Sequence, residues 1–62
     1  MKHLNLTWYN VTCFHPKTGR YRMQFQAVDR VGAVATARAN FVAVFGFLPV
    51  EIFPPNPLLW HP

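Results

Sequence analysis

The segment GRYRMQFQAVDR, residues 19–30, alternates polar and apolar side chains along most of its length. Polar residues share one parity and apolar residues the other: Arg20, Arg22, Gln24 and Gln26 against Tyr21, Met23, Phe25 and Ala27. Such alternation is typical of a β-strand with one buried face. We therefore predict a strand over about residues 20–28, with its apolar row in a core and its Arg/Gln row facing outward.

A second strand is expected immediately before it. Residues 4–14, LNLTWYNVTCF, are rich in β-forming side chains, and the turn signal HPKTG follows them. Pairing Phe14 with Arg20 in an antiparallel hairpin sets Cys13 opposite Tyr21 and makes one face almost wholly apolar. A slip of one residue would mix the polar and apolar rows, so burial favours this register.

The segment after the hairpin has the pattern of an α-helix over about residues 30–45. Asp29 is placed to cap its amino end, and Gly46 suits the left-handed position after its carboxyl end. One apolar stripe at helical spacing contains Val34, Ala37, Phe41, Val44 and Phe45, and a neighbouring flank contains Val31, Ala35 and Val42. Because the helix is apolar over so much of its circumference, we expect it to contact a second subunit as well as its own sheet.

Residues 47–53, FLPVEIF, are expected to form a third strand with Leu48, Val50 and Ile52 facing inward. Pro49 cannot donate a ladder hydrogen bond, so this strand lies at an edge of the sheet or is irregular. The predicted fold class is α+β. It is a small two-layer ββαβ domain over residues 1–53, with an antiparallel three-stranded sheet of order 3-1-2 and one helix packed on one face.

A Pro-rich C-terminal tail, residues 54–62, follows this domain and contains the apolar side chains of Leu58, Leu59 and Trp60. Two alternatives stay open for it. Either the tail completes the core of its own subunit, or it reaches another chain with Trp60 as an aromatic anchor.

A chain of 62 residues forms one domain at most, and its single cysteine, Cys13, excludes a disulfide within the chain. With 52% hydrophobic residues and little interior to hold them, we expect a homodimer or another protein partner. The sequence shows no signal-peptide pattern, and its most apolar window, residues 31–50, is interrupted by a charge and by helix-breaking residues. We therefore expect a cytoplasmic protein without a membrane partner.

The sequence offers no constellation of residues for catalysis, for a cofactor or for a metal ion, so we expect neither an enzyme nor a cofactor. Structural zinc usually needs four N or S ligands, and Cys13 with His15 lacks further ligands at paired spacing. In the predicted register Cys13 points into the core, where a thiol is inert. The only carboxylate side chains belong to Asp29, a helix cap, and Glu51, an outward-facing strand residue.

Two functions from different classes fit these features. The first is a small non-enzymatic protein-binding modulator, an adaptor or inhibitor of the kind encoded by phages and mobile elements, acting as a homodimer. Its candidate interface comprises Val31, Ala35, Val42, Leu58, Leu59 and Trp60.

The alternative is a nucleic-acid-binding accessory or regulatory protein, supported by the net charge of +4 and by the outward row of the hairpin. The candidate nucleic-acid or partner face comprises Trp8, Asn10, Arg20, Arg22, Gln24 and Gln26. A solvent-exposed sheet face without a binding role has a similar composition, so the alternation of polar and apolar side chains does not by itself distinguish it from a recognition surface.

Overall fold

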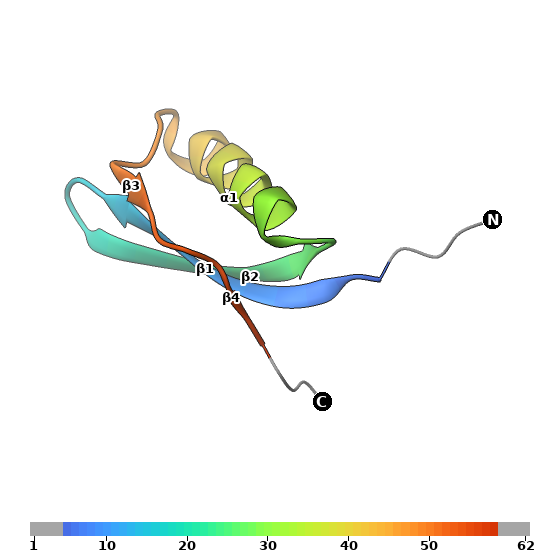
Figure 1. Ribbon diagram of the computed structural model, residues 1–62. Coiled ribbons are helices and arrows are strands. Elements are labelled where there is room, and N and C mark those ends of the chain that lie inside the picture. The colour runs from blue at the N-terminus through green and yellow to red at the C-terminus, as the bar shows by residue number, and fades with distance from the viewer. Residues whose placement is uncertain (1–4, 59–62) are drawn as a thin grey trace.

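Residues 5–58 are described by a computed structural model, which confirms the α+β class with one helix and one antiparallel sheet. The elements are β1 (Thr7–His15), β2 (Gly19–Ala27), α1 (Arg30–Phe45), β3 (Glu51–Ile52) and β4 (Asn56–Pro57). β1 is central, with β2 along one edge and both β3 and β4 along the other. α1 packs over β1 and β2 on one face of the sheet, and no other described element covers the opposite face (Figure 1).

The hairpin has the register predicted from the alternation. Phe14 pairs with Arg20, and the apolar rows of β1 and β2 share the face beneath α1. Gly19 closes the turn at φ 84°, a left-handed conformation that favours glycine. The first strand begins at Thr7 rather than at residue 4, because its partner Ala27 is the last residue of β2 before the chain turns into the helix.

The helix is closed at both ends by the predicted capping residues. The Asp29 carboxylate accepts a hydrogen bond from the amide of Gly32 at 2.8 Å, which satisfies a free donor of the first turn. Gly46 adopts φ 81° and donates its amide to the carbonyl of Val42 at 2.7 Å.

The face of α1 that meets the sheet agrees with the predicted stripe at Ala37 and Phe41, but it is rotated so that Ala33 joins it and Val44 leaves it. Its buried residues are Ala33, Ala37 and Phe41. Val44, expected within the stripe, is 61% exposed. Because alanine side chains are small, a row of them lets the helix lie close to the strands, and the bulkier valine is turned away to the side.

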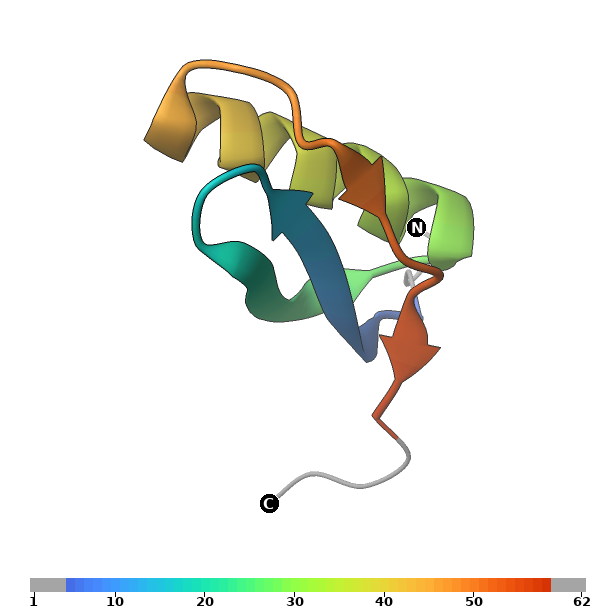
Figure 2. The same ribbon diagram turned by 90° about the vertical axis from the view of Figure 1, so that its left-hand side faces the viewer.

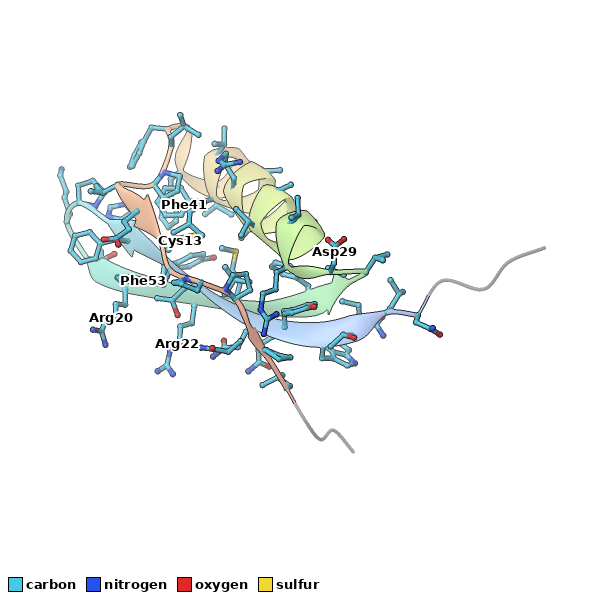
Figure 3. All side chains as sticks on the ribbon, viewed as in Figure 1. Cys13, Arg20, Arg22, Asp29, Phe41 and Phe53 are labelled. Carbon is cyan, nitrogen blue, oxygen red and sulfur yellow. The ribbon has the colours of Figure 1, made fainter. Side chains whose placement is uncertain are left out.

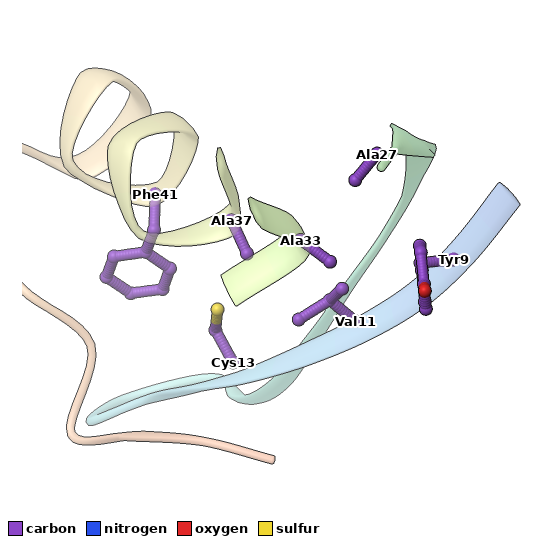
Figure 4. Packing of buried hydrophobic residues seen from close by; sticks show 7 residues of the cluster. All are labelled: Tyr9, Val11, Cys13, Ala27, Ala33, Ala37 and Phe41. Atoms are coloured by element: carbon purple, nitrogen blue, oxygen red, sulfur yellow. The ribbon is translucent and has the colours of Figure 1, made fainter. Parts of the chain in front are cut away.

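The core is small and lies between α1 and the hairpin of β1 and β2 (Figure 4). Its buried members are Tyr9, Val11, Cys13, Ala27, Ala33, Ala37 and Phe41. Three β2 residues predicted for the core, Tyr21, Met23 and Phe25, pack against this cluster but stay half-buried, because β2 is an edge strand. Toward the turn the core ends in an aromatic cluster, in which the ring centroid of Phe45 lies 4.6 Å from that of Phe41.

The third strand is shorter than predicted. Within residues 47–53, the strand comprises only Glu51–Ile52. Leu48 and Val50, expected to face inward, are 63% and 65% exposed. They precede the paired strand, on the connection that carries the chain from the end of α1 down to the sheet (Figure 1).

The first part of the expected tail joins the sheet, so that β3 and β4 follow one another along β1 (Figure 2). Ile52 pairs with Cys13, and Asn56 pairs with Asn10. Between these two pairs, residues 53–55 lie opposite residues 11–12 of β1. Three residues therefore face two, which is the arrangement of a β-bulge. The extra residue falls at two consecutive prolines, which a bulge accommodates because its ladder of hydrogen bonds is interrupted. Within residues 5–58, no helix is long and apolar enough to cross a membrane.

Candidate functional site

The face of the sheet opposite α1 gathers side chains from every strand. By the observed register it holds Trp8, Asn10, Thr12 and Phe14 from β1, Arg20, Arg22, Gln24 and Gln26 from β2, and Glu51 and Asn56 from β3 and β4. We call this surface the open face. Figure 3 shows Arg20 and Arg22 projecting away from α1, whereas Cys13 and Phe41 point between the two layers.

The bulge decides which residues after β3 reach the open face. Phe53 donates its amide to the carbonyl of Thr12 at 2.9 Å, and its side chain lies on the open face. In an uninterrupted strand residue 55 would lie on the same face as Phe53. The extra residue shifts this order, so that Pro55 is buried and Asn56 shares the open face with Phe53.

A shallow groove of about 400 Å³ lies at the centre of the open face. Its floor is formed by two short β1 side chains, Asn10 and Thr12, and its walls by Arg20 and Arg22 on the β2 side and by Phe53 and Asn56 on the other. The larger Trp8 and Phe14 follow at either end along β1.

The groove is positive along its β2 wall. Arg20 and Arg22 are both exposed, and no acidic side chain is among the groove's lining residues. Glu51 also belongs to the open face, but it pairs with Phe14 at the far end of β1. Arg20 reaches across β1, so that its guanidinium carbon lies 5.9 Å from the centroid of the Phe53 ring, a cation–π distance.

Asn10 brings an unsatisfied acceptor to the groove floor. Its Oδ1 atom is buried and has no hydrogen-bond partner among the residues that the structure describes. A buried acceptor without a partner costs about 1–3 kcal/mol. The terminal amide torsion of asparagine is soft, so a donor that enters the groove can recover this energy after a small rotation.

Of the six residues predicted for this face, three line the groove: Asn10, Arg20 and Arg22. Trp8, Gln24 and Gln26 belong to the same face outside it, and Trp8 is half-buried rather than exposed. Asn56 is not found by sequence reasoning because the predicted third strand ends at residue 53, and Phe53, although inside that strand, is not assigned to the open face. The available signal is the proline pair at residues 54 and 55, which marks a bulge inside a strand as readily as the end of a strand.

The residues predicted for a protein interface fall in two places. Val31, Ala35 and Val42 are exposed on α1, where their spacing puts them on one side of the helix, and Val31 is 78% exposed. Leu58 is half-buried beside β1 and donates its amide to the carbonyl of Trp8 at 2.8 Å. Leu59 and Trp60 lie outside the described residues.

Cys13 is fully buried beneath α1, as its predicted register requires. Burial raises the pKa of its thiol, and the positive charge of Arg38 lowers it by a smaller amount. The thiol therefore stays protonated and is a poor nucleophile. Within the described part of the chain, no three His, Cys, Asp or Glu side chains are grouped so that they could hold a metal ion.

His15, expected as an ordinary turn residue, is buried and supports the turn. Its Nδ1 atom accepts hydrogen bonds from the amides of Lys17 at 3.0 Å and Thr18 at 3.2 Å. Its ring packs against the aromatic cluster, with 4.5 Å between its centroid and that of Phe45. Both nitrogen contacts and ring contacts therefore serve the fold of the hairpin.

Comparison with known proteins finds no family, no curated protein and no solved structure that matches this chain.

Proposed function

We propose that this protein is a non-enzymatic nucleic-acid-binding accessory or regulatory protein that works through the open face of its sheet. The observation that carries the proposal is the groove of Asn10, Thr12, Arg20, Arg22, Phe53 and Asn56, in which two guanidinium groups stand beside polar and aromatic side chains. Of the two functions expected from the sequence, this alternative gains the more specific support.

The chemistry of the groove suits a polyanion that also carries flat, hydrogen-bonding rings. Guanidinium groups bind phosphates through forked, charge-assisted hydrogen bonds. Amide side chains such as those of Asn10 and Asn56 match the edges of bases. The net charge of +4 favours approach to nucleic acid over the whole molecule.

The test is fluorescence anisotropy with labelled oligonucleotides at several salt concentrations, comparing the wild type with the double variant Arg20→Gln/Arg22→Gln. Each charged hydrogen bond contributes about 1.5 kcal/mol or more, so we expect the variant to bind at least tenfold more weakly. Loss of two phosphate contacts should also reduce the slope of log K against log salt by about 1.4 to 1.8.

A matched control removes the same charge from the other side of the molecule. Arg30 and Arg38 are exposed on α1, so Arg30→Gln/Arg38→Gln lowers the net charge equally and leaves the open face unchanged. We expect this variant to keep most of the affinity. If both double variants lose the same affinity, binding depends on net charge alone and the open face is not the site.

A protein-binding modulator, either an adaptor or an inhibitor, is the second candidate function. Its support is the exposed apolar side of α1 formed by Val31, Ala35 and Val42. Exposed apolar patches mark interaction surfaces when they are contiguous. Val42→Glu should then abolish capture of a partner, in an assay whose signal is insensitive to salt and unaffected by Arg20→Gln/Arg22→Gln.

For either candidate function, we propose that the protein acts as a homodimer in the cytoplasm. A dimer would cover the apolar side of α1 and double the number of arginines available to one nucleic acid. The single cysteine is compatible with a reducing compartment. Light scattering tests the dimer directly, and a clean monomer at tens of micromolar protein would contradict it.

A further inference from the structure

We propose that the ligand of the groove is a single-stranded nucleic acid, with one unpaired base stacked on Phe53 and its phosphates along Arg20 and Arg22. This inference rests on the proposed function and deepens it, because it states which form of nucleic acid the open face recognises. A duplex that contacts the same arginines is the competing occupant.

The distribution of charge on the open face orients a bound nucleic-acid strand, with its phosphates on one side and its bases on the other. Both cations of the groove stand on the β2 wall, and Glu51 belongs to the opposite edge of the sheet. Phosphates are therefore attracted to the β2 side and repelled from the β3 side. A backbone that follows β2 leaves its bases directed inward over β1, toward Phe53.

Phe53 offers a stacking surface at the place where such a base arrives. It lines the wall that faces Arg20 and Arg22, and the guanidinium carbon of Arg20 lies over its ring, 5.9 Å from the centroid, so an incoming base displaces this side chain and frees it for a phosphate. An aromatic ring with a guanidinium beside it binds the flat face of any base. In a duplex those flat faces are covered by neighbouring base pairs, so this contact is available only to an unpaired base.

The length of the groove floor along β1 matches the size of one base. Asn10 and Thr12 are consecutive same-face residues of β1, which places them about 7 Å apart along the strand. Trp8 and Phe14 are the next residues on this face and limit the floor at both ends. The Oδ1 atom of Asn10 is buried and has no partner among residues 5–58, so a rotation of the side-chain amide would bring this acceptor to an N–H group on the edge of a base.

The experiment measures the affinity of the full chain for two labelled DNA probes, a short single strand and the same strand annealed to its full complement. We expect the single strand to bind at least tenfold more tightly than the duplex at equal salt. Equal affinity, or tighter binding of the duplex, overturns the inference without any variant being needed.

Phe53→Leu then tests the stacking contact, because leucine keeps an apolar side chain but has no aromatic face. Loss of one base–aromatic stack corresponds to about a 5- to 150-fold weakening for the single strand. The duplex should be bound as before. Phe47→Leu is the matched control: Phe47 is an exposed aromatic residue that packs near His15 and does not line the groove, so single-strand affinity should not change.

The outcomes separate this inference from the proposed function. If Arg20→Gln/Arg22→Gln weakens both probes but Phe53→Leu weakens neither, the open face binds nucleic acid and the stacking inference is wrong. If the wild type binds neither probe, the proposed function itself fails. If Phe53→Leu weakens binding of the single strand alone and the arginine variant weakens binding of both probes, the result supports both the proposed function and the stacking inference.

Discussion

His15 is predicted to stabilise the hairpin in two ways that a pair of substitutions can separate. Its Nδ1 atom accepts two turn amides, and its ring lies among aromatic rings. His15→Asn keeps an acceptor at the same position on the side chain, because Oδ1 of asparagine stands where Nδ1 of histidine does, but it removes the ring. His15→Phe keeps a ring and removes the acceptor.

The magnitudes follow from the contacts. Without an acceptor, two partly buried amides each lose about 0.5–1.5 kcal/mol, so His15→Phe should cost roughly 1–3 kcal/mol. The ring centroid of His15 lies 5.9, 4.5 and 5.4 Å from those of Phe41, Phe45 and Phe47. Aromatic pairs at such distances contribute about 0.5–1.5 kcal/mol each, so loss of the three pairs gives His15→Asn a cost of roughly 1.5–4.5 kcal/mol.

His15→Ala loses both contributions and should cost roughly the sum. A domain of 62 residues has a total stability of only about 3–9 kcal/mol, so this variant should be substantially unfolded. Urea unfolding followed by circular dichroism measures all three variants. Lys17→Ala is the control, because Lys17 contributes its backbone amide to the contact and its side chain is exposed.

The reasoning is refuted if His15→Phe is as stable as the wild type, since the amides would then need no acceptor from this residue. It is also refuted if His15→Ala is no less stable than His15→Asn. In that case the acceptor and the ring would not be separate contributions.

Three further predictions follow from the core and the bulge. Phe41→Ala should cost about 3–5 kcal/mol, a large part of the total stability, because Phe41 is the largest fully buried side chain among residues 5–58; a cooperative transition near that of the wild type would contradict this. Because the pKa of the buried Cys13 thiol is raised above its usual value of 9.0, the unfolded state releases this proton first as pH rises. The free energy of unfolding should therefore fall above about pH 9, and the difference from Cys13→Ala, measured by urea titration across this range, isolates the thiol. Removing one of the prolines at residues 54 and 55 should restore an uninterrupted strand and leave Asn56 on the open face. Inserting a third proline beside them should instead turn Asn56 toward the core side. Hydrogen exchange of the β1 amides and oligonucleotide binding distinguish the deletion variant from the insertion variant.

The hairpin could be predicted because its physics is local. A period of two allows only two registers with respect to burial, and one of them mixes arginine with the apolar row. The pairing of Phe14 with Arg20 follows from that choice. The caps at Asp29 and Gly46 are similarly local, since each satisfies backbone groups within four residues of itself.

The face that the helix presents could be predicted only in part, because Ala37 and Phe41 of the predicted stripe are buried whereas Val44 is exposed. The segment is apolar around most of its circumference, so hydrophobic spacing allows several rotations about the helix axis. The choice among them depends on the shape of the sheet, and close approach favours the row of Ala33, Ala37 and Phe41. That information lies in the packing of two elements and in neither element alone.

The groove depends on the same kind of non-local information. Arg20, Arg22 and Asn10 can be placed from the alternation of the hairpin, but the opposite wall exists only because the chain returns beside β1 after the helix. The single extra residue at the proline pair then has two consequences at once: Pro55 closes the core, and Phe53 and Asn56 both remain on the open face. If both prolines were kept in an uninterrupted strand without a bulge, Asn56 would face the apolar layer and lack a partner for its amide. The bulge therefore serves the core as well as the groove, and the segment that the sequence divides between a third strand and a Pro-rich tail supplies two of the six residues that line the candidate site.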